Sequence, residues 1–192
     1  MIITPNHSDT PTYVVCGTPF SGTSLVAGTL RTLGVYFGDE FTHYGTHQDV
    51  ELSLMRTASE RFMAVKQRNQ THFSWGFKSV NMRHWLPEVF PYLRNPIFLY
   101  CSRGLAETLE KSTSIYRQDE QFADMPDLLA EAAFLNEFLL TNAVPWCLLK
   151  FGTEPQDLLD QIIAFTGIEA RDEQLEAALA FNNPRRCYMD IA

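Results

Sequence analysis

Short apolar runs alternate with segments of helical periodicity along this chain. The apolar runs predict buried strands at residues 13–16, 74–77, 97–101 and 145–151. Apolar positions recur at helical intervals in the other segments, which predicts helices at residues 24–33, 49–66, 84–93, 105–116, 125–140, 155–165 and 173–181. Strands that alternate with helices favour a parallel sheet with helices on both faces. We therefore expect an α/β fold, a three-layer α/β/α arrangement around a central parallel sheet, in a single domain over residues 1–192.

The first predicted strand leads into a glycine-containing loop. Gly17 and Gly22 are separated as in the phosphate-binding P-loop, GxxxxGK[ST], and the next helix opens with Thr23 and Ser24. The backbone N–H groups of such a loop and the positive end of the helix dipole form a site for a phosphate. Thr23 stands at the lysine position, and ATP- or GTP-hydrolysing sites use that lysine to reach the β- and γ-phosphates. The loop therefore favours a nucleotide with one 5′ phosphoryl-type group.

Two basic residues follow the second and third predicted strands. Lys78 comes directly after the run 74–77, and Arg103 follows the run 97–101. Ligands of parallel sheets bind beyond the carboxyl ends of the strands. The loop at Gly17, Lys78 and Arg103 should therefore gather at one edge of the sheet.

The loop sequence from Gly17 to Val26, followed by Leu33-Gly34-Val35, resembles the 5′-phosphosulfate loop of PAPS-dependent sulfotransferases of the bacterial type. PAPS is 3′-phosphoadenosine 5′-phosphosulfate, and its product PAP is the 3′,5′-bisphosphate. The resemblance implies a P-loop fold with PAPS as co-substrate, no metal, and 5′ contacts from Thr18, Phe20, Ser21, Gly22, Thr23 and Ser24. Phe20 stands where the family carries the Lys or Arg that holds the phosphosulfate bridge, which bears on turnover more than on binding.

The resemblance extends to the later strands. Lys78 matches the family lysine that reaches the phosphosulfate, and Arg103 matches the arginine that binds the 3′-phosphate. The family places a serine on the 3′-phosphate at the position of Lys111, with Ser112 next, and about 100° of helix separates the two. Either residue can reach the phosphate. Phe151 aligns with a tyrosine near the adenine, and packing in the core is its alternative role.

The general base is predicted from the polar segment around His47. The family glutamate aligns with Gln48, and an amide cannot act as a base. His47 is our candidate because an unperturbed histidine titrates near neutral pH. Asp49 and the more distant His43 are the alternatives.

Composition limits the partners and the compartment. The chain has 15 Lys and Arg against 23 Asp and Glu, a net charge of −8, which disfavours general nucleic-acid or anionic-membrane binding. We see neither a signal peptide nor an apolar run of membrane-spanning length. Cys16, Cys101, Cys147 and Cys187 form no CxxC pair, which favours reduced thiols and a cytoplasmic location. The oligomeric state is not predicted.

These observations lead to one expected function and two alternatives. The first is transfer of a sulfuryl group from PAPS to a hydroxyl or amine of a small-molecule or glycan acceptor, which releases PAP. Phe20, Val80 and Gln48 depart from the family pattern and favour a nucleotide-binding relative with weakened catalysis. A small P-loop nucleotide kinase would require the P-loop lysine and an aspartate at a strand end for magnesium.

Overall fold

A parallel sheet forms the centre of the molecule. The computed structural model describes residues 5–6, 10–39, 52, 57–79, 81–104, 106–110 and 125–182. Within these residues the sheet has four strands in the order β2-β1-β3-β4, and every neighbouring pair is parallel. The strands are β1 (Thr12–Gly17), β2 (Trp75–Lys78), β3 (Pro96–Ser102) and β4 (Trp146–Lys150). All four predicted strands are therefore confirmed, with ends that shift by one residue or so.

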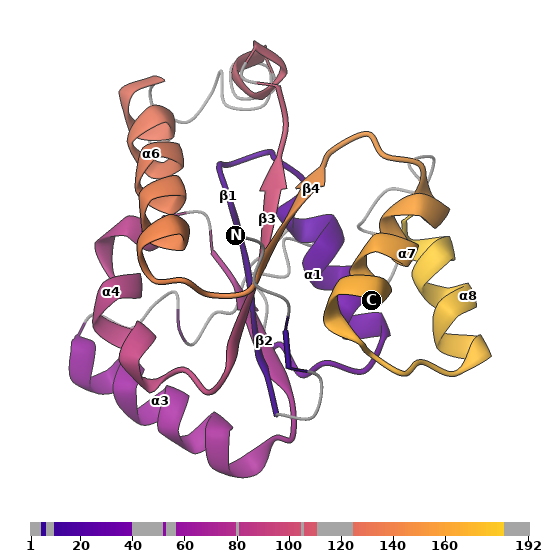
Figure 1. The fold of residues 1–192 in the computed structure, drawn as a ribbon, viewed down its shortest axis with the longest axis horizontal. Helices are drawn as coiled ribbons and strands as arrows, with labels where there is room; N and C mark the ends of the chain where they lie inside the picture. Colours follow the sequence, from indigo (N-terminus) through magenta and orange to yellow (C-terminus); the bar gives the residue numbers. More distant parts are fainter. Residues whose placement is uncertain are drawn as a thin grey trace.

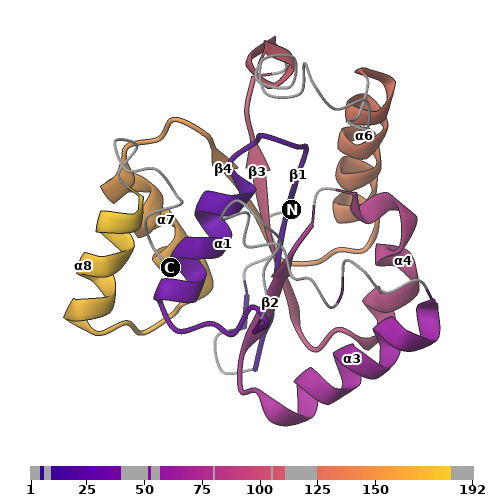
Figure 2. The same cartoon turned by 180° about the vertical axis from the view of Figure 1, so that it is seen from behind.

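Helices cover both faces of the sheet (Figures 1 and 2). One face carries α1 (Thr23–Thr32), α7 (Pro155–Thr166) and α8 (Asp172–Phe181). The other face carries α3 (Ala58–Thr71), α4 (Leu86–Val89) and α6 (Met125–Thr141), with the 3₁₀ turns η1 (Met82–His84) and η2 (Phe90–Tyr92). The predicted three-layer α/β/α class is confirmed.

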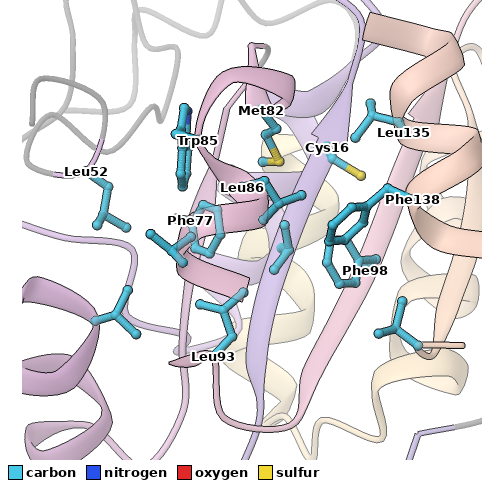
Figure 3. Close-up of a cluster of buried hydrophobic side chains, with 14 of the residues drawn as sticks. Cys16, Leu52, Phe77, Met82, Trp85, Leu86, Leu93, Phe98, Leu135 and Phe138 are labelled. Atoms are coloured by element: carbon cyan, nitrogen blue, oxygen red, sulfur yellow. The ribbon is translucent and has the colours of Figure 1, made fainter. Parts of the chain in front are cut away.

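Alternating side chains of the strands divide the core into two clusters. Val14 and Cys16 of β1 lie in the cluster beneath α3, α4 and α6, whereas Tyr13 and Val15 lie in the cluster beneath α1, α7 and α8. Figure 3 shows the first cluster, in which Cys16 lies among apolar side chains of the sheet and helices. Because β1 is buried on both faces, its sequence is a continuous apolar run.

Two helix predictions need correction. The predicted helix at 84–93 is wrong as a single element, because Pro87 and Pro91 divide it into α4 and η2. The predicted helix at 49–66 is wrong as a single element: Leu52 is helical, but α3 starts separately at Ala58, where Thr57 and Glu60 form a capping box, and it continues to Thr71. Residues 49–51 and 53–56 lie outside the described residues. Of the predicted helix 105–116, residues 106–110 are described and helical.

Candidate functional site

The phosphate loop folds tightly back onto the end of β1. A Cβ atom at Gly17 would lie 2.5 Å from both Ser21 Oγ and the carbonyl oxygen of Cys101, so only glycine fits there. The Ser21 amide donates a hydrogen bond of 3.2 Å to the Thr18 carbonyl, which closes the turn. Phe20, at the tip, has a φ of 64°, the left-handed conformation that a bulky side chain rarely adopts.

The amino end of α1 faces the loop without a side-chain cap. Its N-cap residue is Gly22, with a φ of 96°, and no side chain accepts hydrogen bonds from the first turn. The first N–H groups of a helix have no partners within the helix. Ser21 is 1% exposed, and its hydroxyl finds no hydrogen-bond partner in the part of the chain that the structure describes. Buried donors without partners beside a helix N-terminus provide a binding site for an anion.

Lys78 lies on the same face of the sheet as α1. It pairs with Val15 in the parallel register, and Phe77 before it packs into the opposite cluster. The lysine is 4% exposed, and burial lowers its pKa from 10.5 to about 8. No carboxylate among the described residues forms an ion pair with it. Lys78 therefore still carries a positive charge at neutral pH, buried close to the end of β1.

Arg103 follows β3, on the other side of β1 from Lys78. Its side chain is 9% exposed, and its Nε lies 3.8 Å from Oε2 of Glu107, one helical turn later. Its guanidinium carbon lies 3.4 Å from the ring centroid of Phe151, which follows β4. The same ring contacts the loop, because a Cβ at Gly22 would lie 2.8 Å from Phe151 Cδ2. The Phe151 ring therefore contacts both the loop and Arg103.

The strand ends determine which charges meet at this edge. Lys78 ends β2, Gly17 ends β1, Ser102 precedes Arg103 at the end of β3, and Lys150 ends β4. None of these described strand ends carries a carboxylate. Lys78 is buried and the Arg103 side chain is 9% exposed, and these two cations, on either side of β1, create local positive potential in a chain of net charge −8. The parallel topology therefore brings the loop at Gly17, Lys78 and Arg103 to one edge of the sheet, as predicted.

The remaining predicted residues divide into two groups. Thr18 and Ser24 are half-buried in the loop and first helical turn, and Thr23 is buried. The expectations about the second group stay predictions, because these residues lie outside the described ones: His43, His47, Gln48, Asp49, Lys111, Ser112 and Cys187. The thiols of Cys16 and Cys101 are free and buried, and Cys147 is free and half-buried. Burial raises the pKa of the Cys101 thiol, so that it remains neutral beside Lys78.

Sequence reasoning missed Glu131, a buried carboxyl group on α6. Its oxygens accept hydrogen bonds from the backbone amides of Met82, at 2.7 Å, and Arg83, at 3.4 Å. Glu131 is 2% exposed, and burial raises its pKa. These contacts fasten α6 to η1, the turn that follows β2 and Lys78. In sequence, a glutamate inside a helix is typical of a solvated face, so no local signal marks this role.

Two further observations concern the chain as a whole. Within the described ranges, no three His, Cys, Asp or Glu side chains are grouped so that they could hold a metal ion. None of the described helices combines the length and apolar character that a membrane crossing requires.

Comparisons with known proteins support the class of fold. No protein-family model matches the chain, and no curated protein matches it in sequence. Among solved structures, an unliganded sugar kinase from Janibacter sp. HTCC2649 is similar, with a TM-score of 0.51 and 14% identity over 83% of this chain and 95% of that one. At this identity the similarity concerns the fold alone. The protein thus has an α/β fold similar to that of this sugar kinase.

Proposed function

We propose that the protein is a sulfotransferase that moves a sulfuryl group from PAPS to a hydroxyl or amine acceptor and releases PAP. The observation that carries this proposal is the position of Lys78 and Arg103, buried cations on opposite sides of the strand that leads into the phosphate loop. The sequence resemblance of the loop to sulfotransferases supports it independently. A small molecule or a glycan is the proposed acceptor.

The charges of PAPS fit this arrangement. PAPS carries a phosphosulfate at its 5′ end and a separate phosphate on its 3′ oxygen. The loop amides, the first turn of α1 and Lys78 are proposed to bind the 5′ group. Arg103 is proposed to bind the 3′-phosphate, because a planar guanidinium donates paired hydrogen bonds to phosphate oxygens. Lys111 or Ser112 completes the 3′ site in this proposal.

The proposed reaction is a displacement at sulfur. The acceptor oxygen or nitrogen forms a bond to sulfur while the bond between sulfur and the 5′-phosphate oxygen breaks, and the acceptor proton passes to a base, for which His47 is our candidate. Negative charge develops on the departing phosphate. The loop amides and Lys78 stabilise this charge in a site of low exposure, where electrostatic effects are strong. Burial of Lys78 therefore contributes to its proposed role.

Two observations favour other functions. Phe20 occupies the loop tip where sulfotransferases carry a cation, which favours a relative that binds the nucleotide and does not turn over. The similar solved structure is a sugar kinase, which favours phosphoryl transfer. Against a kinase, Thr23 replaces the P-loop lysine, and β2, next to β1, ends on a lysine and not on a magnesium-binding carboxylate.

A transfer assay separates these functions. The purified protein is incubated with PAPS labelled with radioactive sulfur and a panel of hydroxyl and amine acceptors, and in parallel with labelled ATP, Mg²⁺ and sugars. Labelled sulfate on an acceptor supports the sulfotransferase. Labelled phosphate on a sugar supports the kinase and refutes our proposal. If neither labelled product forms and PAP binds tightly, the result supports the nucleotide-binding relative with weakened catalysis.

A further inference from the structure

We propose that Phe151 is a positioning residue: it holds the Arg103 guanidinium at a fixed place beside the phosphate loop and thereby sets the preference for nucleotides with a 3′-phosphate. This inference rests on the proposed function. It concerns a residue whose ring stands in neither of the two core clusters.

The backbone brings Phe151 next to Arg103. Ser102 pairs with Lys150 at the last position of the β3–β4 register, and the Phe151 amide donates a further hydrogen bond of 2.8 Å to the Ser102 carbonyl. The ladder between the two strands therefore extends to the point where both side chains leave the sheet. Arg103 and Phe151 emerge side by side without reliance on a flexible loop.

The ring then fixes the direction of the guanidinium. The two groups are in face contact, at 3.4 Å from the guanidinium carbon to the ring centroid. A stacked guanidinium keeps its N–H donors at the edge of its own plane, where they can still meet an anion. The contact with Glu107 is weaker support, because that carboxylate is 69% exposed and its ion pair is screened by solvent.

The contact of the Phe151 ring with Gly22 sets the position of Arg103 relative to the phosphate loop. Phe151 Cδ2 lies so close to Gly22 that no Cβ fits between them. One rigid side chain thus spans from the N-cap of α1 to Arg103. Arg103 is therefore ordered before a ligand arrives, which removes an entropic cost from binding. The ring also fixes the spacing between the proposed 5′ and 3′ anion sites.

Affinities for PAP and AMP measure this role, because the two ligands differ only in the 3′-phosphate. Calorimetric titration of wild type and Phe151→Leu gives the ratio of the two dissociation constants. We expect Phe151→Leu to reduce the preference for PAP about tenfold and Phe151→Tyr to retain it. Phe73→Leu is the matched control, since that phenylalanine is 78% exposed and precedes β2 at the other end of the strand. If Phe151→Leu does not fold, Phe151→Met replaces it.

A second set of variants separates positioning from general packing. In an Arg103→Ala background, Phe151→Leu should leave the ratio unchanged, because the group that the ring positions is gone. An equal reduction in both backgrounds, or no reduction in either, would overturn the inference while a wild-type preference for PAP still supports the proposed function. A wild-type protein that binds PAP and AMP equally would refute the 3′ site itself and the inference with it.

Discussion

Lys78 pairs with Val15 across β2 and β1, so its side chain emerges on the face covered by α1, just before Gly17 opens the phosphate loop. The sequence of β2 determines this orientation, because Phe77 packs into the opposite cluster. Few positions in the described fold combine a full cation with such low exposure. The proposed chemistry depends on this residue.

Replacement of Lys78 should separate transfer from binding. Lys78→Ala should abolish sulfuryl transfer but change PAP affinity by no more than tenfold, roughly 1.4 kcal/mol, because PAP lacks the sulfuryl group that Lys78 serves. Transfer from labelled PAPS and calorimetry with PAP measure the two effects. Lys66→Ala, at an exposed position of α3, is the control. Full activity of Lys78→Ala would remove the lysine from the mechanism.

Lys78 should also make stability depend on pH. Its pKa is about 8 in the folded chain against an ordinary 10.5, so between these pH values the unfolded chain binds more protons and stability rises with pH. Below pH 8 the protein bears the whole cost of the buried charge, up to about 3 kcal/mol. Lys78→Met removes this cost. Its stability advantage over wild type should therefore be largest near pH 7 and shrink towards pH 10.5.

Urea unfolding of both proteins at matched pH tests this expectation. Burial raises the pKa of the Cys16 and Cys101 thiols, and this lowers stability at alkaline pH in both proteins. The effect cancels when the two are compared. A stability difference that stays constant across the window would mean that burial does not lower the pKa of Lys78.

Loss of Arg103 should weaken the nucleotide and spare the fold. Arg103→Ala should reduce the free energy of PAP binding by roughly 2–4 kcal/mol, as expected when one member of a charged hydrogen-bonded pair is removed. Thermal unfolding checks the fold. Arg171→Ala is the control, because that side chain is 75% exposed at the start of α8. Unchanged PAP affinity in a folded Arg103→Ala protein would remove the arginine from the proposed 3′-phosphate site.

Phe20 decides between an enzyme and a binding protein. Phe20→Arg restores the cation of the family at the loop tip, and the left-handed backbone there bears equally on both side chains. If the protein is a sulfotransferase, this variant should keep or raise the rate of transfer from labelled PAPS. If neither wild type nor Phe20→Arg transfers sulfate to any acceptor while PAP binds tightly, the protein is a binding relative.

Much of the fold follows from local sequence. The strand β1 is a nearly continuous apolar run because both of its faces are buried, and the loop at Gly17 is recognisable because its backbone accepts only glycine. The start of α3 was missed, although Thr57 and Glu60 form the pattern of a capping box in the sequence. The predicted helix 84–93 is wrong as a single element because Pro87 and Pro91 interrupt its apolar periodicity.

The site was predictable only in part. Lys78 and Arg103 follow strands, so parallel topology alone brings them to one edge. The contact of Phe151 with Gly22 and the burial of Glu131 depend on packing between segments distant in sequence. No local pattern encodes such contacts. A phenylalanine after a strand and a glutamate in a helix have the same sequence appearance whether they serve the site or not.

The most direct test of the central claim is calorimetric competition among PAP, AMP and ATP with Mg²⁺ on the wild-type protein. The account predicts that PAP binds at least tenfold more tightly than either of the others, because Arg103 engages a 3′-phosphate that both lack. Equal competition by AMP and PAP would show that there is no 3′-phosphate site, and tighter binding of ATP with Mg²⁺ would assign the loop to a kinase.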